Sequence, residues 1–102
     1  MDTQLVKTVE KIEMYVPTAF SPNGDGLNDL LRPILFGIKE LHYFKIYNRT
    51  GQLLYETKSA DGGWDGRFKG APQFSQVVAW IMEGKGVDNK IYTRKGITAL
   101  VR

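Results

Sequence analysis

Cysteine is absent from this sequence, and long apolar segments are scarce. Without cysteine the chain can form neither disulfides nor thiolate metal sites, so its redox compartment cannot be inferred. The longest uninterrupted apolar run, Val77–Met82, spans six residues, whereas a helix that crosses a bilayer needs roughly 20. We therefore expect no direct insertion into a membrane.

Groups that could perform catalysis are also few. The sequence has one histidine, His42, and no serine in the pattern of a hydrolase nucleophile elbow. No glycine-rich segment continues into the Gly-Lys-Ser or Gly-Lys-Thr of a phosphate-binding loop. Paired carboxylates could act alone on glycosides, but 102 residues rarely provide a substrate cleft as well as a core. We predict no catalytic residues and no enzymatic activity.

The overall composition is typical of one globular domain. Its 102 residues are 42% hydrophobic, and 14 Lys and Arg against 11 Asp and Glu give a net charge of +3. The two signs are interspersed, whereas a protein that binds nucleic acid usually carries a basic stripe. Tyr43, Lys45 and Tyr47 are expected to form a solvated sheet face rather than a base-stacking platform. No nucleic-acid partner is predicted.

The beginning of the chain differs from the rest. Residues 1–10 carry Asp2, Lys7 and Glu10 and lack the apolar region of an export signal. We interpret residues 1–11 as the end of a linker or as residues added for expression, and residues 12–102 as the domain. An export leader is expected elsewhere, at the start of a longer parent chain, and the isolated domain is expected to be a monomer.

Short strands separated by turn clusters fill the domain. Apolar alternation predicts strands over residues 11–16, 41–48, 52–57, 77–83 and 91–102, the last running to the final residue. Phe44 and Ile46 are expected to face inward, and residues 77–83 to form a central strand covered on both faces. One helical turn is possible at residues 28–31, before Pro33. The pattern predicts an all-β fold, an antiparallel immunoglobulin-like β-sandwich of about seven strands.

Two turns have a defined chemistry. Between residues 41–48 and 52–57, Asn48 and Gly51 predict a hairpin in which glycine supplies a positive φ. The loop at residues 61–66 contains Trp64, Asp65 and Gly66. Its tryptophan is expected to plug one end of the sandwich, although an exposed ring could instead stack on a sugar.

The loop at residues 21–29 has the spacing of a calcium loop. With Gly26 at the sharp turn, the candidate ligands are Ser21, Asn23, Asp25, Asp29 and the carbonyl of Leu27. At the twelfth position, however, Arg32 replaces the bidentate acid. Asn and Asp side chains also cap turns without any metal, and this interpretation is favoured. Calcium is the one possible cofactor.

Several of these segments together resemble a known family. They are Val16–Asp29 with its Ser-Pro-Asn-Gly-Asp-Gly-Leu-Asn-Asp string, Phe44–Leu53, Gly63–Gly66, Lys95–Thr98 and Leu100–Arg102. In this order they resemble the gliding-motility-associated C-terminal domain, the type B cargo domain of the Bacteroidota type IX secretion system. The resemblance implies a C-terminal sorting signal that directs a larger surface protein from the periplasm across the outer membrane, to the cell surface or the medium.

The same resemblance implies partners. They would be an outer-membrane barrel and other translocon components, reading loop shape or strand edges. The candidate recognition residues are Asn23, Asp25, Asn28, Asp29, Lys95, Gly96, Leu100, Val101 and Arg102. An alternative from another functional class is an immunoglobulin-like adhesion or glycan-binding module, with Trp64 and Tyr55 or Tyr47 as stacking platforms.

Overall fold

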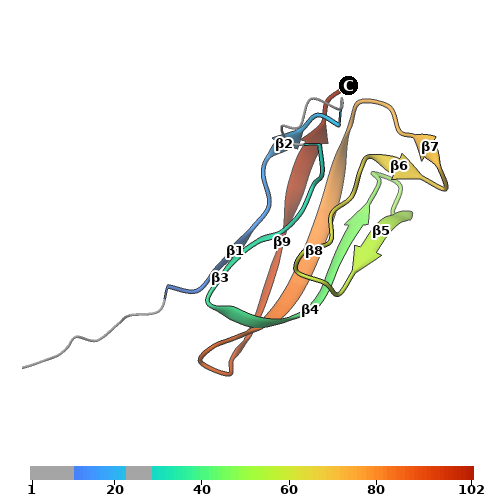
Figure 1. Ribbon diagram of the computed structural model, residues 1–102. Coiled ribbons are helices and arrows are strands. Elements are labelled where there is room, and N and C mark those ends of the chain that lie inside the picture. The colour runs from blue at the N-terminus through green and yellow to red at the C-terminus, as the bar shows by residue number, and fades with distance from the viewer. Residues whose placement is uncertain (1–10, 23–28) are drawn as a thin grey trace, which may run out of the picture.

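A computed structural model describes residues 11–22 and 29–102 of the chain, and within these ranges the fold is all-β. None of the described residues forms a helix that is long and apolar enough to cross a membrane. The strands, drawn in Figure 1, are β1 (Glu13–Tyr15), β2 (Ala19–Phe20), β3 (Ile34–Phe36), β4 (Ile38–Tyr47), β5 (Leu53–Thr57), β6 (Arg67–Phe68), β7 (Ala71–Pro72), β8 (Gln76–Gly86) and β9 (Ile91–Leu100).

The main layer is a five-stranded sheet in the order β2-β9-β8-β4-β5. The long strands β4, β8 and β9 run the length of the molecule (Figure 1). The order β9-β8-β4-β5 corresponds to strands G, F, C and C′ of a variable-type immunoglobulin sheet. The predicted sandwich class and the central position of the apolar strand are therefore confirmed.

One pair departs from the antiparallel expectation, because β2 runs parallel to β9. The chain leaves β1 in the second layer, passes through Pro17, and joins the edge of the main sheet at Ala19. A two-residue strand carries no periodic signal from which its partner could be predicted.

The second layer is thin. It consists of the pair β1-β3, followed by an isolated bridge between Leu31 and Trp64 whose two N–H···O bonds measure 2.8 and 2.9 Å. The small pair β6-β7 forms a separate hairpin beyond β5 (Figure 1). Because these short strands supply few side chains, large residues in the connecting loops complete the core.

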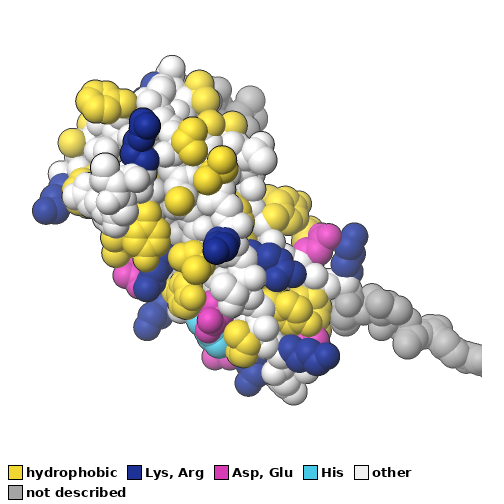
Figure 2. Space-filling view, turned by 180° about the vertical axis from the view of Figure 1, so that it is seen from behind, with side chains coloured by type: hydrophobic (Ala, Val, Ile, Leu, Met, Phe, Trp, Pro, Cys, Tyr) yellow, Lys and Arg dark blue, Asp and Glu magenta, His cyan; other side chains and the backbone are white. Residues whose placement is uncertain are grey.

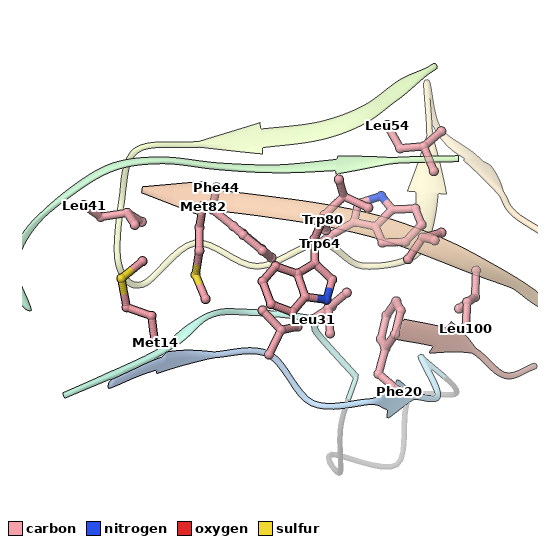
Figure 3. Packing of buried hydrophobic residues seen from close by; sticks show 13 residues of the cluster. Met14, Phe20, Leu31, Leu41, Phe44, Leu54, Trp64, Trp80, Met82 and Leu100 are labelled. Carbon is pink, nitrogen blue, oxygen red and sulfur yellow. The ribbon is translucent and has the colours of Figure 1, made fainter. Parts of the chain in front are cut away.

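Thirteen buried hydrophobic residues fill the space between the layers. Phe44 and Ile46 are fully buried, as predicted, and Trp64 is only 1% exposed. In Figure 3, side chains of the main sheet and of the facing segments point toward one another, with Trp64 near Leu31. The other members are Met14, Val16, Phe20, Leu41, Leu54, Val78, Trp80, Met82 and Leu100.

Three details of the sequence prediction are wrong. Val77 on β8 is 50% exposed, so this strand is covered on one face only. Residues 29–31 are not helical, because Leu31 pairs with Trp64 instead. The last strand ends at Leu100 and not at the final residue, and the next two backbone N–H groups donate to the Phe20 carbonyl and to Ser75 Oγ.

Candidate recognition surface

The end of β9 is fixed by a buried chain of hydrogen bonds. The indole Nε1 of Trp80 donates to Thr98 Oγ1 at 3.1 Å, and the Thr98 hydroxyl donates to the Pro17 carbonyl at 2.7 Å. Thr98 is 1% exposed, so water cannot replace a hydrogen-bond partner of its hydroxyl that is removed. These two bonds connect β8, β9 and the segment before β2.

The candidate residues at this end fall into two groups. Leu100 is 1% exposed and belongs to the core, so a partner that docks on the folded domain does not reach its side chain. Gly96 lies directly against the ring of Trp80, where a side chain would collide. Lys95 and Val101 are exposed.

Arg102 connects the end of the chain to two loops. Its guanidinium donates to the carbonyls of Gln73 and Gly66, both at 2.7 Å, and its backbone N–H donates to Ser75 Oγ at 2.8 Å. The structure thus brings together Arg102 and Gly66, two residues that the sequence analysis placed in separate sites. Removal of Arg102 would take away these three hydrogen bonds, while the bond from the Gln73 N–H to the Gly66 carbonyl would remain.

The loop at residues 61–66 buries its tryptophan. Trp64 Nε1 donates to the Arg67 carbonyl at 2.7 Å, and the ring centroids of Trp64 and Phe20 are 5.6 Å apart. Asp65 accepts a hydrogen bond from the Arg67 N–H at 3.0 Å, and Gly66 has a φ of 83°. A ring this deeply buried offers no face to a sugar, so the stacking role proposed for Trp64 is wrong.

The β4-β5 hairpin is organised by Asn48. Its Oδ1 accepts hydrogen bonds from the N–H groups of Thr50 and Gln52, at 3.0 and 2.9 Å. Gly51 has a φ of 89°, the left-handed conformation that the hairpin prediction requires of it. Arg49, at the tip of this turn, lies beside the outer side of β8 and β9.

Sequence reasoning missed an exposed apolar area on the outer side of the main sheet. We call it the outer patch, and it comprises Val77, Ala79, Ile81 and Ile97. Val77 is 50% exposed and Ile97 67% exposed. Ala79 and Ile97 line two adjoining shallow hollows, one bordered by Arg49 and the other by Lys95. The pairing Ala79↔Ile97 places β8 and β9 side chains next to each other on this side.

Charged side chains lie among hydrophobic ones on the face shown in Figure 2. Seen from behind, hydrophobic groups and Lys or Arg side chains are interspersed over the surface (Figure 2). Lys45 Nζ lies 3.8 Å from Glu56 and 4.9 Å from the ring of Tyr43.

Two titratable pairs do not belong to the outer patch, although Glu83 follows Ile81 on the same face of β8. His42 Nδ1 is 2.8 Å from Glu83 Oε2, and a bulge in the β4-β8 pairing turns His42 away from the side of Phe44. In the β8-β9 turn, Tyr92 Oη donates to Asp88 at 2.6 Å, which lowers the pKa of Asp88 and raises the pKa of Tyr92. Glu40 Oε1 lies 3.9 Å from His42 Nε2, but the described residues form no group of three or more histidine or acidic side chains that could hold a metal ion.

The candidate calcium loop falls largely outside the described residues. Asn23, Asp25, Gly26, Leu27 and Asn28 are not described, while Ser21 and Asp29 flank them. Both the metal interpretation and the turn interpretation of this loop therefore stay predictions.

Comparison with known proteins identifies the family. A model of the CHU_C type IX secretion signal domain matches residues 14–98. No curated protein and no solved structure matches the chain. The matched segment begins in β1 and ends near the end of β9, so it covers both layers of the fold. The chain therefore belongs to the type IX secretion signal domain family, whose members are C-terminal sorting signals for export across the outer membrane.

Proposed function

We propose that the secretion machinery recognises this domain in its folded form, through an outer-membrane barrel component that docks on exposed parts of the main sheet. The family is a secretion signal, not a catalytic family, and its function implies contact with the machinery. The domain folds in the periplasm during transit and reaches the cell surface or the medium with its parent protein.

The extent of the family match carries this proposal. A signal read as an extended peptide would need only a short segment, but the match covers residues 14–98. That segment includes Met14, Phe44, Trp64 and Met82, all at most 5% exposed. A partner that binds the folded domain cannot contact these side chains, so their presence in the signal serves the fold.

A pair of fusions tests the proposal. The whole chain is joined to the C-terminus of a folded periplasmic reporter in a host that has the type IX machinery. We expect export of the wild-type fusion and loss of export with Trp64→Ala, which empties the centre of the core. Export of a Trp64→Ala fusion whose domain is unfolded by circular dichroism would show that the fold is not what is read.

A further inference from the structure

The outer patch lies next to an open strand edge. β9 pairs with β8 along its whole length, but with β2 only at Ala99 and Leu100. In the described part of the chain, no strand pairs with β9 from Ile91 to Thr98 on that side. Such an edge is a template for an added strand.

The direction of the open backbone groups follows from the bonds to β2. The N–H of Ala99 donates to Thr18 and the N–H of Val101 to Phe20, both at 2.9 Å. Because backbone groups alternate sides along a strand, the N–H groups of Thr93, Lys95 and Ile97 point toward the open edge. The side chains of Lys95 and Ile97 lie on the same face as the outer patch.

The charges beside the patch are available to a partner. Within the described ranges, neither Arg49 nor Lys95 forms an ion pair, whereas Lys45 is close to Glu56. The acidic group nearest to Lys95 along β8 is Glu83, and its carboxylate contacts His42 instead. The apolar patch therefore has unneutralised positive charge at two of its borders.

These charges favour a different molecule over a second copy of this chain. In an antiparallel pairing of two β9 edges centred on this segment, Arg94 and Lys95 of one copy would lie near those of the other, and like charges across a pair are destabilising. Basic residues on an edge strand are a known protection against self-association. An acidic strand would gain from the same residues.

We propose that the open edge of β9 and the outer patch bind an extended acidic and apolar segment of the secretion machinery by strand addition. The segment forms backbone hydrogen bonds with Thr93, Lys95 and Ile97. It places an apolar side chain beside Ile97 and, two residues away, an acidic side chain beside Lys95. This inference rests on the proposed function, because it names the surface by which the folded domain is read.

The first test compares matched surface variants in the reporter fusion. Ile97→Glu and Lys95→Glu are each expected to lower the exported fraction about tenfold. Val87→Glu is the control, because Val87 is an exposed valine in the β8-β9 turn, away from the patch. Equal melting temperatures of the variants show that the fold is kept. Export of both β9 variants at the wild-type level would overturn the inference while leaving the proposed function intact, whereas failure of the wild-type fusion would remove the proposed function itself.

The second test measures binding directly. The probe, called the valine-glutamate peptide, consists of three Val-Thr-Glu-Thr repeats, so that valine and glutamate lie two residues apart on one face of a strand. Three Val-Thr-Lys-Thr repeats form its control, the valine-lysine peptide. In titrations followed by amide NMR, we expect the first peptide to shift and protect Thr93, Lys95 and Ile97, with Kd raised about tenfold by Lys95→Glu. Equal binding of the valine-lysine peptide, shifts confined to β5, no binding at millimolar peptide, or self-association through the same amides would each overturn the proposal.

A proline variant isolates the backbone contribution. Thr93→Pro removes an N–H that points to the open edge and takes no part in the β8-β9 pairing, a position at which a strand tolerates proline. We expect this variant to fold and to lose the peptide-induced shifts at Lys95 and Ile97. A folded Thr93→Pro domain that binds the valine-glutamate peptide with unchanged Kd would exclude strand addition at this edge.

Discussion

The ring of Trp80 lies directly against the backbone of Gly96, the residue beside it on the neighbouring strand. A Cβ placed on Gly96 would be 2.7 Å from Cζ2 of the indole. Because Gly96 has no side chain, the indole can occupy this space and donate its Nε1–H to Thr98. The Lys95-Gly96 segment, considered a recognition motif from the sequence, is on this evidence also a packing motif.

We expect Gly96→Ala to destabilise the domain by about 1–3 kcal/mol, the usual effect of overpacking a filled core. The added methyl would collide with a ring that is itself 8% exposed and held by a hydrogen bond. Chemical denaturation checks this. The double variant Gly96→Ala, Trp80→Phe should recover part of the loss, because the smaller ring leaves room. A double variant that loses as much stability as the two single variants added together would contradict the steric explanation.

The hydroxyl of Thr98 is expected to matter more than its methyl. Thr98→Val keeps the shape but leaves the Trp80 N–H and the Pro17 carbonyl without their partner, a loss of about 1–3 kcal/mol for buried groups. Thr93→Val, on the same strand but exposed, is the matched control and should change stability little. Similar urea midpoints for the two variants would show that the hydroxyl chain does not stabilise the fold.

The alternation of apolar and polar residues along a strand predicts part of this fold, the β4-β5 hairpin. Phe44 and Ile46 are both fully buried, because their spacing and the Gly51 turn fix the register of one hairpin. Strict alternation would place His42 on the same face, but a bulge between Leu41 and Tyr43 buries Leu41 instead. A bulge belongs to the pairing of two strands, and one strand's sequence does not reveal it.

The outer patch shows a second limit of the sequence. The run Val77–Met82 has apolar residues on both faces, so it has no phase that separates core from surface. The run alone predicts a strand covered on both sides, yet Val77 is 50% exposed. A second apolar face is covered only if the chain has a layer on that side of the sheet, and the described layer of β1 and β3 packs on the opposite side, against the core.

The Gly51 turn gives a test of backbone strain without steric contact. A Cβ at Gly51 would have no atom within 4 Å, but its φ is 89°. Gly51→Val is therefore expected to cost more than about 1 kcal/mol through the backbone alone. Gly51→Asn should cost less, because asparagine tolerates the left-handed region. An unchanged melting temperature for Gly51→Val would refute this account.

The pair in the β8-β9 turn predicts a pH effect. The hydrogen bond from Tyr92 lowers the pKa of Asp88 in the folded state, so the folded protein releases this proton more readily than the unfolded chain. The contribution is present above the ordinary carboxyl pKa and is lost as pH falls through the lowered value. Tyr92→Phe should raise the pKa of Asp88, as followed by carboxyl NMR. A titration that Tyr92→Phe leaves unchanged would assign the shift to other groups.

A calcium titration distinguishes the two interpretations of the loop at residues 21–29, turn capping and metal binding. If Asn and Asp side chains only cap the backbone, as the missing acid at Arg32 favours, millimolar calcium should leave the melting temperature unchanged. A calcium site would instead raise the melting temperature with calcium concentration, because a ligand that binds only the folded state stabilises it. Magnesium at equal ionic strength is the control, and Asp25→Asn should abolish any specific rise. We expect no calcium-specific rise, and one that Asp25→Asn removes would establish the metal site.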